Sequence, residues 1–140
     1  MKKALIVFGG WPGHEPEKCN EILSKFLNSE GYEVRSENST EAFAEDYVHE
    51  MDLIIPIVTM AFHHSPKGEI KKNEVNNLIK AVVNGCGLAG HHGGMCDAFR
   101  QSIDWQFLTG GQWVSHPNGI HDYKVNICLL YTSDAADDSL

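Results

Sequence analysis

The residues of this sequence with the clearest capacity for chemistry are its histidines, because imidazole carries protons and binds metals near neutral pH. Five of the eight histidines lie in three short segments that each follow a predicted strand. The segments are residues 9–15 (GGWPGHE), 60–65 (MAFHHS) and 90–97 (GHHGGMCD), and His116 follows later in residues 115–117 (SHP). A lone loop histidine is usually a solvated bystander. Histidines that recur after successive predicted strands indicate a functional cluster instead.

Four segments predict the strands that would position these loops. Residues 4–8 (ALIVF) form a continuous apolar run, which is typical of a strand covered on both faces. Residues 32–36 alternate and predict a short edge strand, residues 52–58 predict a third strand, and residues 87–90 predict a fourth. Because proline has no N–H to donate, we expect the regular pairing of the third strand to end near Pro56.

Apolar residues spaced as on one face of a helix separate these strands. The spacing predicts helices within residues 19–27, 43–51 and 75–83, and a further helix within 97–105, whereas residues 110–114 favour an extended segment. The alternation of strands and helices implies right-handed crossovers, so we predict an α/β fold with a three-layer, doubly wound parallel sheet. In such sheets ligands bind outside the carboxyl ends of the strands, which is where the histidine segments lie.

Residues 90–94 (GHHGG) have the G-x-X-x-G form of a nucleophile elbow, a tight turn from strand to helix that displays its central side chain. The central residue here is His92. Imidazole is a good proton carrier and metal ligand, but it is a poor substitute for a thiolate that must be acylated.

Three motifs of the sequence resemble those of the ThuA-like (trehalose-utilisation) family. They are GGW with HE in residues 9–15, GLAGHHGG in 87–94 and GGQWVSHP in 110–117, and the last two together are fairly specific. The resemblance covers residues 1 to about 127. It implies a flavodoxin-like fold similar to that of class I glutamine amidotransferases, and a small-molecule sugar, trehalose or a related keto-sugar, as substrate. Because His92 stands where those amidotransferases need cysteine, the resemblance carries over the fold and the pocket but not the glutaminase chemistry.

Two uses of the histidines follow. One is a divalent metal such as zinc, bound by His14, His92 and either Glu15 or His116, with a metal-bound water as nucleophile. No HExxH or other short-range signature supports that metal site. The other is metal-free general acid–base catalysis on a sugar by His14 or His92, in an enzyme of the hydrolase or isomerase class.

The site expected from the sequence has a catalytic and a binding part. His14 and His92 are the candidate catalytic residues and also the candidate metal ligands. The candidate substrate-binding residues are Trp11, Glu15, His63, His91, Asp97 and His116.

Two other classes of function compete with a histidine enzyme. The same aromatic residues and histidines could hydrogen-bond a sugar in a non-catalytic carbohydrate-binding domain. A cysteine amidotransferase-type enzyme is the less favoured alternative. We expect no nucleotide cofactor, because GGWPG lacks the GxGxxG order and Pro12 removes an N–H that a phosphate would need.

The composition of the chain limits the classes of partner that it is expected to bind. A net charge of −8 argues against a general nucleic-acid binder, and no stretch approaches the ~20 apolar residues that a membrane span requires. The four cysteines form no CxxC pair and no dense framework, which predicts a cytoplasmic location. The oligomeric state cannot be inferred from these features.

The last thirteen residues differ in character from the rest of the chain. Residues 128–140 (CLLYTSDAADDSL) resemble the translation of a sequencing adaptor read in frame. We therefore expect residues 1–127 to be part of a ThuA-like domain truncated at its C-terminal side, and residues 128–140 to be non-native.

Overall fold

A computed structural model of the chain describes residues 1–61, 72–115, 119 and 121–124. The described part is built on a four-stranded, all-parallel sheet with the strand order β2-β1-β3-β4. The strands are β1 (Lys2–Gly10), β2 (Tyr32–Glu37), β3 (Leu53–Thr59) and β4 (Gly87–Leu88). This is the order of the first four strands of a flavodoxin-like sheet, which confirms the predicted α/β fold.

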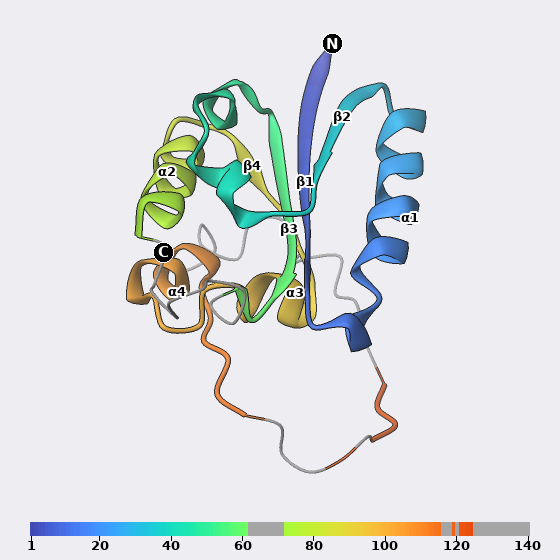
Figure 1. Ribbon diagram of the computed structural model, residues 1–140, viewed down its shortest axis with the longest axis vertical. Helices are drawn as coiled ribbons and strands as arrows, with labels where there is room; N and C mark the ends of the chain where they lie inside the picture. The colour runs from blue at the N-terminus through green and yellow to red at the C-terminus, as the bar shows by residue number, and fades with distance from the viewer. Residues whose placement is uncertain (62–71, 116–118, 120, 125–140) are drawn as a thin grey trace, which may run out of the picture.

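Helices cover both faces of the sheet. Figure 1 shows α1 (Pro16–Ser29) on one side of the sheet, with α2 (Lys72–Val83) and α4 (Ile103–Thr109) on the other. The short α3 (His92–Cys96) packs at the lower end of β3. No helix in the described part of the chain is long and apolar enough to cross a bilayer.

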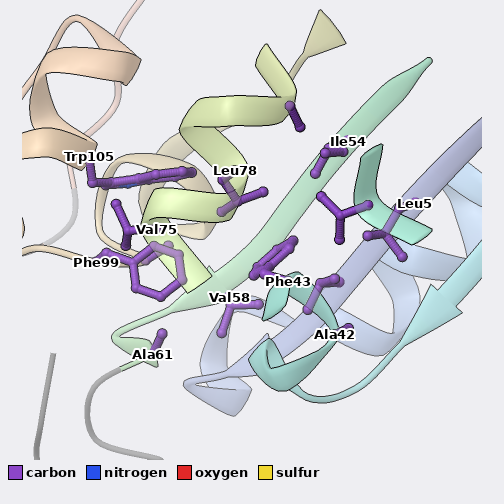
Figure 2. Close-up of a cluster of buried hydrophobic side chains, with 14 of the residues drawn as sticks. Leu5, Ala42, Phe43, Ile54, Val58, Ala61, Val75, Leu78, Phe99 and Trp105 are labelled. Atoms are coloured by element: carbon purple, nitrogen blue, oxygen red, sulfur yellow. The ribbon is translucent and has the colours of Figure 1, made fainter. Parts of the chain in front are cut away.

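Each face of the sheet has its own core, and β1 contributes to both by alternation. Ala4 and Ile6 pack with Leu27 of α1, whereas Leu5 and Val7 face the opposite cluster. Figure 2 shows that second cluster, in which side chains from β1, β3, α2 and α4 meet. A strand buried on both faces explains the continuous apolar run in this part of the sequence.

The helix predicted within residues 43–51 is wrong in type. The segment forms two short 3₁₀ helices, η2 (Thr40–Ala44) and η3 (Asp46–Glu50), separated by Glu45 in an extended conformation. The amide of Asn77 on α2 donates to the carbonyl oxygens of Phe43 and Glu45, at 2.8 and 3.2 Å. The side chain of Asn77 therefore binds carbonyl groups that a continuous α-helix would bond internally.

The expectation that pairing ends at Pro56 is wrong for the ladder with β1, which continues to the pair Gly10 and Thr59. Asp52, just before β3, and Ile54 within it bond toward β4, since their carbonyl oxygens accept from Gly87 N and Ala89 N. Alternation along a parallel strand places the nitrogen of Pro56 on that same side, just beyond the end of β4. The missing N–H therefore costs the β1 ladder nothing.

The helix predicted within residues 97–105 is wrong in its bounds. The structure ends α3 at Cys96 and begins α4 at Ile103, where the hydroxyl of Ser102 caps the helix by accepting from Trp105 N. The carbonyl oxygens of Asp97 and Ala98 accept from the N–H groups beyond β3, which holds this connection out of a helix. Residues 110–114 belong to no strand.

Candidate functional site

A pocket lies at the carboxyl ends of β1, β3 and β4, the edge at which a doubly wound sheet binds ligands. Its cavity volume is about 260 Å³. The lining residues within the described part are Trp11, His14, Thr59, Met60, His92, Gly93, Asp97, Arg100 and Trp113.

His14 enters the pocket from the turn that follows β1. Gly10 has a φ of +82°, and a Cβ there would lie 2.1 Å from the carbonyl oxygen of Thr59, so only glycine lets β1 pass β3 this closely. The short 3₁₀ helix η1 (Pro12–His14) then leads into α1. Nδ1 of His14 forms a 2.7 Å hydrogen bond with Oγ1 of Thr59, which fixes the orientation of the imidazole.

His92 occupies the centre of the predicted elbow between β4 and α3. Its φ is +50°, a left-handed backbone conformation that is uncommon for a residue with a side chain. The elbow fits against the sheet because two of its residues are glycines and carry no side chain. A Cβ on Gly94 would lie 3.1 Å from Cα of Ile57, and a Cβ on Gly93 would lie 3.1 Å from Cε1 of His14. The glycines therefore bring the two histidines together.

Backbone strain is concentrated at this edge of the sheet. In the described part of the chain, the non-glycine residues with positive φ are Glu15, Met60 and His92. They follow β1, β3 and β4 respectively, and two of them line the pocket. Strained backbone of this kind clusters at functional sites, because packing must hold it in place.

The aromatic rings of the site form a continuous row. The ring centroids of His14 and His92 are 4.8 Å apart with an interplanar angle of 79°. Trp11 contacts His14 at 4.7 Å, and Trp113 contacts His92 at 5.8 Å, both edge to face. Two imidazoles thus lie between two indoles, and His14 and His92 contact each other at the predicted edge of the sheet.

A charged pair borders the same pocket. Nε of Arg100 donates to Oδ1 of Asp97, whose side chain is 4% exposed, against 34% for Arg100. This hydrogen bond raises the pKa of Arg100, although partial burial acts in the opposite direction. The guanidinium therefore stays protonated beside a buried carboxylate.

Four of the residues expected from the sequence line the pocket: Trp11, His14, His92 and Asp97. Glu15 does not line it. Its carboxylate pairs with Lys18 on the exposed surface of α1. His91 precedes α3 as an exposed residue and is also absent from the lining. His63 and His116 lie outside the described residues.

Sequence reasoning missed Thr59, Met60 and Arg100 as lining residues. The position of Thr59 at the end of a strand was a usable signal, since strand ends meet at the binding edge. Arg100 follows Asp97 by three residues, a spacing that pairs opposite charges within one turn. Nothing in the sequence marks Met60, whose place depends on its positive φ.

The described part of the chain contains no group of three or more histidine, cysteine, aspartate or glutamate side chains arranged to hold a metal. Cys19, Cys86 and Cys96 are free thiols, and none of them lines the pocket. The elbow therefore presents imidazole where a thiol-dependent amidotransferase requires cysteine.

A doubly wound parallel sheet with a pocket at its strand ends and a histidine at the elbow defines a flavodoxin-like α/β protein. The sequence matches the model of the ThuA family, described as trehalose utilisation, over residues 3–135, and the chain belongs to that family. Searches of curated proteins and of solved structures gave no significant match.

Proposed function

We propose that this chain binds a sugar, trehalose or a related keto-sugar, and that His14 and His92 exchange protons with it. The observation that carries the proposal is the contact of the two imidazoles, 4.8 Å apart, in a pocket at the strand ends. Membership of the trehalose-utilisation family supports the sugar. Trp11 and Trp113 support it further, because broad indole faces suit the apolar faces of a sugar ring.

The chemistry of the pocket favours an isomerase among the sugar-metabolising enzymes. Isomerisation of a keto-sugar through an enediol needs a base that removes a proton from the carbon beside the carbonyl and an acid that protonates the carbonyl oxygen. A proton then returns to the former carbonyl carbon, and the neighbouring hydroxyl gives up its proton to become the new carbonyl. Two imidazoles suit these steps, because each exchanges protons near neutral pH. Glycoside hydrolysis usually requires two carboxylates. Among the described lining residues, Asp97 is the sole carboxylate.

Thr59 gives the two histidines different environments. The hydrogen bond through Nδ1 orients the ring of His14, so proton exchange with the substrate would involve its Nε2. His92 is held by the strained backbone of the elbow and is more exposed. We assign His14 the role of base and His92 that of acid, because a fixed ring suits abstraction of a proton from carbon.

Solvent deuterium exchange tests the proposal. The protein is incubated with keto derivatives of trehalose or simple ketoses in D2O, and exchange beside the carbonyl is followed by NMR. We expect His14→Ala and His92→Ala each to lower the exchange rate by about 10²–10⁴-fold, the usual contribution of a general acid or base. His121→Ala is the matched control, because His121 is exposed and outside the pocket lining.

Two results would contradict the enzymatic proposal. Equal exchange rates in the wild type and both variants would remove the histidines from the reaction. Sugar binding without any exchange or turnover would support the non-catalytic carbohydrate-binding domain instead. A thiol-directed reagent that left activity intact would eliminate the cysteine amidotransferase-type alternative.

Zinc at His14 and His92 is a second candidate, favoured by the spacing of the two rings. Two imidazoles bound to one tetrahedral zinc have centroids about 5 Å apart, close to the 4.8 Å observed. Thr59 would then act as the outer partner that orients His14. A catalytic zinc normally has three protein ligands, so we rank this candidate below metal-free catalysis. Equal zinc content in the wild type and a His14→Ala, His92→Ala variant would reject it.

The proposed location is the cytoplasm, on the ground that the sequence has no CxxC pair and no dense cysteine framework.

A further inference from the structure

The Asp97–Arg100 pair borders the pocket but has no part in the proposed proton transfer. Asp97 lies at the end of α3, and Arg100 lies three residues later, before α4. Both side chains line the pocket beside His92 and Thr59. The carboxylate is almost fully buried, whereas the guanidinium is about one-third exposed.

The backbone holds this pair firmly. The carbonyl oxygen of Asp97 accepts from Met60 N at 3.2 Å, which ties it to the end of β3. The carbonyl oxygen of Arg100 accepts from Nε2 of Gln106 on α4 at 2.6 Å. Anchored from both sides, the pair keeps its place without help from a ligand.

The two charges compensate each other. Asp97 and Arg100 are the only aspartate, glutamate, lysine or arginine residues among the described residues of the lining. An anionic group entering the pocket meets a guanidinium whose charge is already offset, and a buried carboxylate that repels it. Like charges brought together in a binding site are strongly unfavourable.

The pair still offers hydrogen bonds to neutral groups. A guanidinium has five N–H donors, and the hydrogen bond to Asp97 uses the one on Nε. The terminal nitrogen atoms suit hydroxyl and carbonyl oxygens, and the second carboxylate oxygen suits a hydroxyl donor. Adjacent hydroxyls of a sugar present this combination of donor and acceptor.

We infer that the Asp97–Arg100 pair determines specificity by admitting neutral sugars and excluding phosphorylated or acidic ones. The inference rests on the proposed sugar function and adds the charge class of the substrate. Arg100 donates to oxygen atoms of the neutral sugar. Asp97 cancels the charge that would otherwise attract a phosphate or carboxylate.

Asp97→Asn tests this directly, because it removes the negative charge and keeps an oxygen that accepts from Arg100. Binding is measured by calorimetry for glucose, trehalose, glucose 6-phosphate and inorganic phosphate. We expect the wild type to bind neither phosphate compound measurably. The variant should gain at least about 10-fold in affinity for both, and this gain should fall as salt is added. The ratio of its affinity for glucose 6-phosphate to its affinity for glucose should therefore rise by at least about 10-fold.

Glu21→Gln is the matched control, since it removes the acid of an ion pair with Lys25 on the exposed surface of α1. It should leave every affinity unchanged. Arg100→Gln provides a second variant in case the asparagine protein does not fold. This variant should have an affinity for neutral sugars that is about 10-fold lower, and it should still not bind glucose 6-phosphate measurably.

Three outcomes would overturn the inference. The first is tight binding of glucose 6-phosphate by the wild type, and the second is no increase in the affinity of Asp97→Asn for the phosphate compounds. The third such outcome is an affinity for neutral sugars that is unchanged in Arg100→Gln. The proposed function fails separately, if the wild type binds no sugar. Inorganic phosphate would still report on the charge compensation in that case.

Discussion

At the scale of single residues, the bond between His14 and Thr59 is the contact most easily separated from the rest of the site. Thr59 is 4% exposed and ends the central strand of the pocket edge. Its hydroxyl carries no charge and cannot replace either histidine as a proton carrier at neutral pH. It therefore acts by positioning the ring of His14.

Thr59→Val should lower the deuterium exchange rate by about 10-fold, less than His14→Ala, because the ring loses its orientation but keeps its nitrogen atoms. Loss of the bond should also lower the free energy of unfolding by about 1 kcal/mol. Thr59→Ser keeps the hydroxyl and should restore most of the rate. An exchange rate in Thr59→Val equal to that of the wild type would show that the bond has no catalytic role.

The residue types of the site could be predicted only in part. His14 and His92 were predictable because strand ends converge and because the elbow pattern singles out its central residue. Glu15 does not line the pocket, and its carboxylate pairs with Lys18 on the exposed surface, which the sequence does not indicate. The spacing of Arg100 from Asp97 indicates an ion pair, but its place in the pocket could not be predicted from sequence, because that place depends on where the connection after α3 turns.

At the scale of elements, the elbow depends on the absence of side chains where α3 crosses β3. The closest approach is at Gly94, which is buried against the backbone of Ile57. No flexible side chain at this contact can move aside. The backbones of the elbow and of β3 would therefore have to move apart if a Cβ were added at Gly94.

Gly94→Ala should lower the free energy of unfolding by about 1–3 kcal/mol, the usual cost of overpacking. It should also move His92 relative to His14 and reduce exchange activity. Gly111→Ala is the control, because a Cβ at that position meets nothing within 4 Å and its backbone is unstrained. Thermal unfolding of the two variants compares them, and equal stability would show that the contact with Ile57 is not tight.

The order of strands and helices was predictable, because apolar period and β-favouring runs are local properties of the sequence. The errors arose where contacts between residues far apart in the sequence determine the local structure. Asn77 bonds to carbonyl groups of the segment that includes η2, and the side of β3 on which Pro56 directs its nitrogen depends on which strand is its neighbour. Neither fact can be read from the segment itself.

At the scale of the whole molecule, the sheet is stabilised by cores on both faces. Cys86 belongs to the cluster shared by the sheet, α2 and α4. Burial raises the pKa of its thiol from 9.0 to about 11.

The boundary at residue 127 stays a prediction, and residues 128–140 lie outside the described part.

This buried thiol should make stability fall as the solution becomes alkaline. Above pH 9 the unfolded chain loses the Cys86 proton while the folded chain keeps it up to about pH 11. The unfolded state then binds fewer protons, so the free energy of unfolding decreases as pH rises. Urea unfolding at pH 8 and pH 10.5 should show a smaller decrease in Cys86→Ala than in the wild type. Equal decreases would show that the thiol ionises in the folded protein.

The edge-to-face contact of Trp11 with His14 gives the protein an internal optical reporter. A protonated imidazole quenches the fluorescence of an indole it touches, whereas a neutral one does so far less. Trp105 lies fully buried and donates its indole N–H to the carbonyl oxygen of Met95, so its emission should be blue-shifted and insensitive to the pocket. The red-shifted emission of the half-exposed Trp11 should therefore change when a ligand that alters this contact enters the pocket, without any added dye.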